Sequence, residues 1–143
     1  MEINFNVGSL KIVYNPLMEY FKKIQGNVSH NLVLIRDEKK VATNHEAIDL
    51  LVKAQGTLKM IGLLGIVKVL SLNTEAVREV KEVKHDTAKS VAILEVVNNT
   101  IRNLVVYLEN LLNGEQDQPT KFYEQYSQLA NLLGKKVSVK DLF

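Results

Sequence analysis

VKAQGTLKMIG, residues 52–62, stands inside a long helical pattern and carries two glycines, Gly56 and Gly62. Apolar residues recur around these glycines at helical spacing, which predicts a helix with one buried face. The run Thr43-Asn44-His45-Glu46 has the form of a capping box and predicts the start of this helix. We expect a turn or kink between Gly62 and Gly65. The predicted core positions of the helix are Ile48, Leu51, Leu58 and Ile61.

Apolar stripes continue on both sides of this segment and predict an all-α protein. Asn15 before Pro16 predicts the N-cap of a first helix that runs to about Glu38. Later helices are predicted after Gly65, after an Asp86 cap, and from Pro119 to Gly134. Long helices with short connections favour an antiparallel four-helix bundle with an extra C-terminal helix. Inward positions are predicted at Leu17, Phe21, Ile24, Val28, Leu32, Ile35, Ile66, Val69, Leu70, Val77, Val80, Val83, Val91, Leu94, Ile101, Val105, Leu108, Leu111, Phe122, Tyr126, Leu129 and Leu133.

The two ends of the chain lack this helical pattern. Residues 3–7 alternate like a strand that has no partner, so we expect residues 1–9 to form an N-terminal arm. Residues 135–143 are expected to form an extended, loosely held tail. The whole of 1–143 is predicted to be a single domain, because its length suits one domain.

Composition excludes several classes of function. The chain has 143 residues, 46% of them hydrophobic, and no cysteine, so neither disulfides nor thiolate chemistry is available and a reducing compartment is expected. The formal net charge is +2, with 18 basic and 16 acidic residues interspersed, which does not indicate nucleic-acid binding. The apolar run 60–67 is too short to span a membrane, and no basic secretory leader is visible.

The central stretch resembles the helix of histidine phosphotransfer (HPt) domains, which carries His-x-x-Lys-Gly and a second glycine six residues later. Gly56 and Gly62 match the two glycines, whereas Val52 stands at the histidine position and Gln55 at the lysine position. Val52 has no nucleophile and Gln55 has no charge to neutralise a phosphoryl group. The resemblance therefore implies a phosphotransfer scaffold that lacks its catalytic residues.

A wider resemblance covers most of the chain. It is similar to the N-terminal segment of ChpA/PilL-type proteins, the CheA-like hybrid histidine kinases that control type IV pilus twitching motility. The segments that carry the resemblance are Val7-Gly8-Ser9-Leu10-Lys11-Ile12-Val13, Ala54-Gln55-Gly56-Thr57-Leu58-Lys59-Met60-Ile61-Gly62-Leu63, Tyr107-Leu108-Glu109-Asn110-Leu111-Leu112-Asn113-Gly114 with Gln118-Pro119, and Asp141-Leu142-Phe143.

This resemblance implies a cytoplasmic, non-catalytic HPt-like domain for docking or assembly in chemotaxis-like two-component signalling. It implies a fragment of a longer kinase, with no cofactor or metal in this segment. The expected partners are response-regulator receiver domains or other domains of the kinase, with self-association open and neither nucleic acid nor membrane expected. The binding residues would be Lys53, Gly56, Lys59 and Gly62.

Three alternatives stay open at this point. The two glycines could serve only close helix packing. The domain could be an active phosphotransfer module that uses His30, His45 or His85, although none of these is followed by x-x-Lys-Gly and we interpret all three as surface or capping residues. The chain could also be a plain helical oligomerisation module without any link to a phosphorelay.

Overall fold

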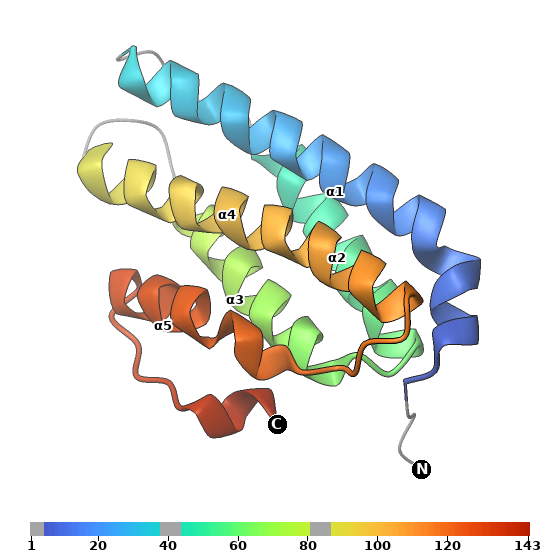
Figure 1. Cartoon of the computed structure of the whole chain (residues 1–143). Helices are drawn as coiled ribbons and strands as arrows, with labels where there is room; N and C mark the ends of the chain where they lie inside the picture. The colour runs from blue at the N-terminus through green and yellow to red at the C-terminus, as the bar shows by residue number, and fades with distance from the viewer. Residues whose placement is uncertain (1–4, 38–43, 81–86) are drawn as a thin grey trace.

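The computed structural model describes residues 5–37, 44–80 and 87–143, and in these ranges it is helical without strands (Figure 1). The all-α prediction is therefore confirmed. Five α-helices and two short 3-10 helices follow one another along the described chain. Their bounds are α1 Val7–Arg36, α2 His45–Met60, α3 Leu64–Glu79, α4 Thr87–Leu112, η1 Pro119–Phe122, α5 Tyr123–Leu132 and η2 Val139–Leu142.

The long helices surround one core. α1 packs against both α2 and α4, α2 packs against α3, and α5 covers α3 and α4. α1 and α4 lie side by side and run in opposite directions, as do α2 and α3 (Figure 1). This arrangement leaves the outer faces of α2 and α3 next to each other on the surface of the protein.

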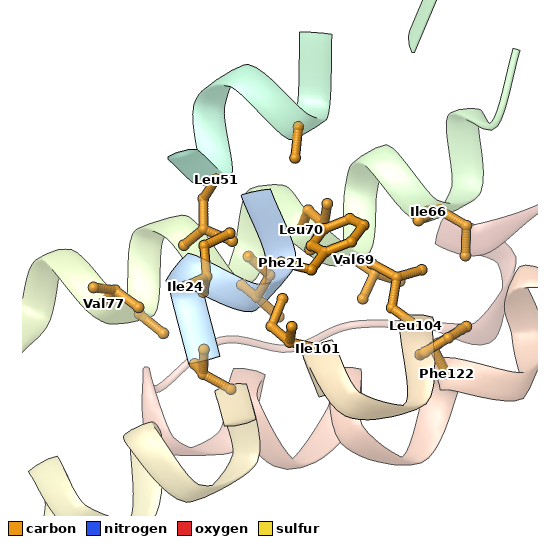
Figure 2. Packing of buried hydrophobic residues seen from close by; sticks show 14 of the residues in the cluster. Phe21, Ile24, Leu51, Ile66, Val69, Leu70, Val77, Ile101, Leu104 and Phe122 are labelled. Carbon is orange, nitrogen blue, oxygen red and sulfur yellow. The ribbon is translucent and has the colours of Figure 1, made fainter. Parts of the chain in front are cut away.

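The core is made of the apolar stripes that the sequence predicts. Figure 2 shows Phe21 and Ile24 of α1 meeting Leu51 of α2, Leu70 of α3 and Ile101 of α4. Burying one such side chain stabilises the fold by about 1.5–3 kcal/mol. Most predicted inward positions are buried, while Ile48, Val91, Val105 and Leu133 are half-buried and Val83 lies outside the described residues.

The start of α1 differs from the prediction. The helix begins at Val7, because the Asn6 side chain accepts a hydrogen bond of 2.9 Å from the Ser9 amide and caps it. The predicted cap at Asn15 is wrong, and Pro16 lies inside the helix. Pro16 is exposed and Ile12, whose carbonyl loses its helical donor, is 82% exposed, so water can replace the missing hydrogen bond. The predicted arm thus loses residues 7–9 to the helix, while residues 1–4 lie outside the described ones.

The start of α2 depends on long-range contacts. Thr43 of the predicted capping box lies outside the described residues, and the Asn44 side chain makes no capping hydrogen bond. Instead, Asn44 accepts a 2.6 Å hydrogen bond from Asn31 of α1 and donates one of 2.7 Å to the Val80 carbonyl after α3. This single amide joins the ends of three helices.

The connection between α2 and α3 is the predicted sharp turn. Gly62 has φ of 86°, a left-handed conformation that favours glycine and ends α2. Gly65, in the first turn of α3, is buried against η1 and η2. A Cβ atom on Gly65 would overlap the Pro119 ring and lie 2.8 Å from the Leu142 carbonyl oxygen, so only glycine permits this approach.

The C-terminal region is more ordered than predicted. α4 ends at the predicted Asn113-Gly114, with φ of 98° at Gly114. The segment predicted as a loose tail contains η2, which a capping box between Ser138 and Asp141 starts. Residues 135–138 have no regular secondary structure, but Leu142 is fully buried, so the prediction of an extended, loosely held tail is wrong for η2. The cause is a tertiary contact, since η2 packs on α3.

α4 is the one helix among the described residues that is long and apolar enough to cross a membrane. Nearly half of its most apolar window, 44%, is buried inside the protein. Its buried side chains, among them Leu94, Ile101 and Leu108, belong to the core that α1 shares. The apolar composition of α4 therefore has a packing explanation.

Candidate functional site

The outer face of α2 carries most of the residues that the sequence singles out. Leu51 and Leu58 point into the core, whereas Val52 is 48% exposed and Met60 is 72% exposed. Val52, Gly56 and Met60 recur at intervals of four, so they form one stripe on the solvent side of the helix. Lys53 and Lys59 are exposed beside this stripe. Val52, Gly56 and Met60 therefore form an apolar strip on the surface of α2, with a lysine side chain on either side of it.

Gly56 lies at the centre of this strip and is exposed. Beyond its chain neighbours and the backbone of its own helix, a Cβ atom at Gly56 would meet no atom within 4 Å, so close helix packing does not explain the glycine. A glycine inside a helix costs about 1 kcal/mol relative to alanine. Gly62 differs, because its positive φ at the α2–α3 turn gives it a conformational role. The structure therefore separates the two glycines that the sequence pattern pairs.

Gln55, at the other predicted degenerate position, is attached to the neighbouring helix. Its Nε2 atom donates a 2.7 Å hydrogen bond to the Thr74 hydroxyl, which itself donates to the Leu70 carbonyl at 2.8 Å. Gln55 is half-buried as a result. Of the predicted core positions of this helix, Leu51, Leu58 and Ile61 are buried, while Val52 is exposed and Gln55 is half-buried.

A groove of about 400 Å³ runs between α2 and α3 next to Val52. The residues of α3 that line this groove were not predicted, because the local sequence does not show which outer residues of α3 face α2. The available signal is a polar stripe on α3 at intervals of three and four residues, formed by Ser71, Glu75 and Arg78. The lining residues are Val52, Gln55, Ser71, Thr74, Glu75 and Arg78.

The groove lining carries one basic and one acidic side chain, Arg78 and Glu75. The exposed surface of α2 and α3 carries charges of both signs, with Asp49 and Glu79 exposed as well as the cations. Lys53, Lys59 and Arg78 are exposed on the two helices. Glu75 is the acidic residue in the groove, and both of its carboxylate oxygens accept hydrogen bonds from Lys135, at 2.5 and 2.6 Å. This half-exposed pairing screens the negative charge of Glu75 and leaves Arg78 as the cation of the groove lining.

The two described histidines lie elsewhere. His30 is exposed on α1 and His45 is exposed at the first position of α2, while His85 lies outside the described residues. Neither of the two described histidines lines the groove beside Val52. Within residues 5–37, 44–80 and 87–143, no three His, Asp or Glu side chains gather to hold a metal ion.

A larger groove, of about 710 Å³, lies at the turn end of α2 and α3. Phe5, Leu64 and Phe143 supply its apolar walls, and Gly62 lies on its edge. Of the predicted binding residues, Lys53, Gly56 and Lys59 therefore share the α2 face, whereas Gly62 belongs to this second region.

Comparison with known proteins identifies no relative. No family model, no curated protein and no solved structure matches the chain.

Proposed function

We propose that this chain is a non-catalytic, HPt-like docking module of a cytoplasmic, CheA-like chemosensory kinase of the type IV pilus class. Its helices would correspond to those of a phosphotransfer bundle. The outer strip of α2, defined by Val52, Gly56 and Met60, would contact a receiver domain. Without a nucleophile at Val52, docking would hold a regulator near the kinase or compete with active phosphotransfer domains, and it would not transfer phosphate.

The observation that carries the proposal is Gly56 together with the exposed apolar side chains one turn away on either side, Val52 and Met60. Gly26 is an equally open helical glycine, but polar residues, Lys22 and His30, lie at the corresponding positions around it. An exposed helical glycine with open space around its Cβ position lowers helix stability, and it does not allow another part of the protein to pack more closely. A requirement for a flat surface explains it, because a partner that approaches α2 gains contact when no side chain projects there. The exposed apolar side chains on either side, Val52 and Met60, give such a partner a surface to bury.

Binding of a receiver domain, measured by NMR titration and by calorimetry, tests this proposal. Gly56→Gln should weaken or abolish binding because the new side chain projects from the strip. Gly26→Gln is the matched control, since Gly26 is also exposed in a helix and open around its Cβ position. Both substitutions should stabilise the protein, by roughly 0.5 kcal/mol each, because glutamine is the better helix former.

Two results would overturn the proposal. One is the failure of a broad panel of receiver domains to bind the unmodified chain at all. The other is self-association of the chain through α2, observed by ultracentrifugation and abolished by Gly56→Gln, which would identify an oligomerisation module.

A further inference from the structure

The groove between α2 and α3 has the chemistry of a site for one anionic side chain. Its base is closed by the hydrogen bond between Gln55 and Thr74, which links the two helices. Val52 forms an apolar wall, and Ser71 and Arg78 on α3 supply a hydroxyl and a guanidinium group. The groove, of about 400 Å³, is large enough to accept an Asp or Glu side chain.

Arg78 is the arginine of the groove lining. Its side chain is exposed, and it makes no hydrogen bond or ion pair within the part of the chain that the structure describes. The other two arginines have contacts, since Arg36 pairs with Glu95 and Arg102 reaches Asn99 at 3.5 Å. A guanidinium group presents paired N–H donors that match a carboxylate in bidentate geometry.

Glu75 is the one residue of the groove that would repel an anion. Lys135 lies outside the groove lining and holds the Glu75 carboxylate at 2.5 and 2.6 Å. The ion pair is half-exposed, so it screens the charge of Glu75 without removing it. A singly charged carboxylate meets less of the remaining repulsion than a doubly charged phosphate does.

We infer that the α2–α3 groove binds an acidic side chain of the docked partner, with Arg78 as the specificity-determining residue. This inference rests on the docking function proposed above. The Arg78 guanidinium would donate two hydrogen bonds to the carboxylate, and the Ser71 hydroxyl would donate a third. The adjoining strip with Gly56 would form the flat surface that the partner contacts, and the groove would select a partner with an acidic side chain at this position.

Receiver-domain binding to Arg78 variants of the full chain tests the inference. Arg78→Gln should raise the dissociation constant about 10- to 100-fold, because it leaves the partner's carboxylate unpaired in the contact. Arg78→Lys should recover part of the lost affinity, since lysine keeps the positive charge but lacks the paired N–H donors of the guanidinium group. Arg102→Gln, an exposed arginine on α4, is the matched control and should bind as the unmodified chain does.

The Glu75–Lys135 pair gives a second, independent readout. Lys135→Gln should weaken binding several-fold because it exposes the charge of Glu75 to the partner's carboxylate. Glu75→Gln should tighten binding, since it removes the repulsion and leaves Lys135 free nearby. If the ion pair only stabilised the fold, Lys135→Gln and Glu75→Gln would change the dissociation constant in the same direction.

The outcomes separate the two proposals. If Gly56→Gln abolishes binding while Arg78→Gln leaves the dissociation constant unchanged, the groove inference is wrong and the docking function stands. If the unmodified chain binds no receiver domain, both are wrong. The thermal unfolding midpoint of each Arg78, Glu75 and Lys135 variant should stay close to that of the unmodified chain, which shows that the changes act on binding.

Discussion

Val52 and Leu58 occupy the same helix but opposite environments. Val52 is 48% exposed on the strip, whereas Leu58 is fully buried in the core. The apolar period of the sequence predicts this difference, because successive helical positions point in fixed directions. The partner of Gln55 was not predictable in this way. Its hydrogen bond reaches Thr74 on another helix, and local periodicity carries no information on such a contact.

Substitutions at these two positions should therefore differ in cost. Leu58→Ala should lower the free energy of unfolding by about 2–5 kcal/mol, because it leaves a cavity in the core. Val52→His should change it by no more than about 0.5 kcal/mol, since its site is open to solvent. Urea denaturation followed by circular dichroism measures both. Similar losses for the two variants would show that the assigned orientation of α2 is incorrect.

At the scale of elements, the sequence predicts where the helices lie better than where they begin. Amphipathic stripes are local and mark all five α-helices. Pro16 led to a wrong prediction of the helix start, because proline is common in the first turn of a helix. In the structure Asn6 caps the helix earlier, and Pro16 lies inside the helix at an exposed position where water can replace the missing hydrogen bond. The end of α2 is predicted correctly, since Gly62 is a local signal. η2 is missed because it depends on the burial of Leu142 against another element.

The contact of Gly65 with η1 and η2 gives a prediction at this scale. Gly65→Ala should destabilise the protein by about 1–3 kcal/mol, because the added methyl group overlaps Pro119 and approaches the Leu142 carbonyl. Gly26→Ala, at an open helical glycine, should instead stabilise it by about 0.4–1 kcal/mol. Chemical denaturation gives both signs. A stabilising Gly65→Ala would mean that η1 and η2 do not pack closely on α3.

At the scale of the whole molecule, Tyr107 connects α4 to the segment that follows it. Its hydroxyl donates to the Asp117 carboxylate at 2.5 Å and accepts from the Gln118 amide at 2.5 Å. Its ring packs edge-on against Phe122, with centroids 5.1 Å apart. Burial, together with the hydrogen bond to Asp117, raises the pKa of Tyr107 well above its usual range. The neutral phenol is therefore the form that the fold stabilises.

This raised pKa predicts a loss of stability in alkali. Above about pH 10 the unfolded chain releases the Tyr107 proton while the folded chain retains it, so the free energy of unfolding falls as pH rises. Below pH 10 this contribution is fully present. Tyr107→Phe should be less stable near neutral pH, by about 0.5–1.5 kcal/mol, but should lose less stability between pH 10 and 11.5. Equal alkaline slopes for the two proteins, measured by urea denaturation, would contradict the assignment.

The candidate site shows the same division between local and long-range information. The α2 strip, with Lys53, Gly56 and Lys59, follows from the sequence because one helix carries it. The groove could not be predicted from the sequence, since Arg78 and Glu75 belong to α3 and Lys135 belongs to the chain after α5. Their juxtaposition depends on how α3 and α5 pack.

Phosphoryl transfer to the protein distinguishes a docking module from an active phosphotransfer domain. The unmodified chain and the variant Val52→His with Gln55→Lys are incubated with a phosphorylated receiver domain, and acid-labile phosphate on the chain is measured. We expect no phosphate on the unmodified chain, because the strip has no nucleophile. We expect measurable phosphate on the variant, because it restores the acceptor and its cation. Phosphate on the unmodified chain, at His30, His45 or His85, would contradict the claim that this module docks without chemistry.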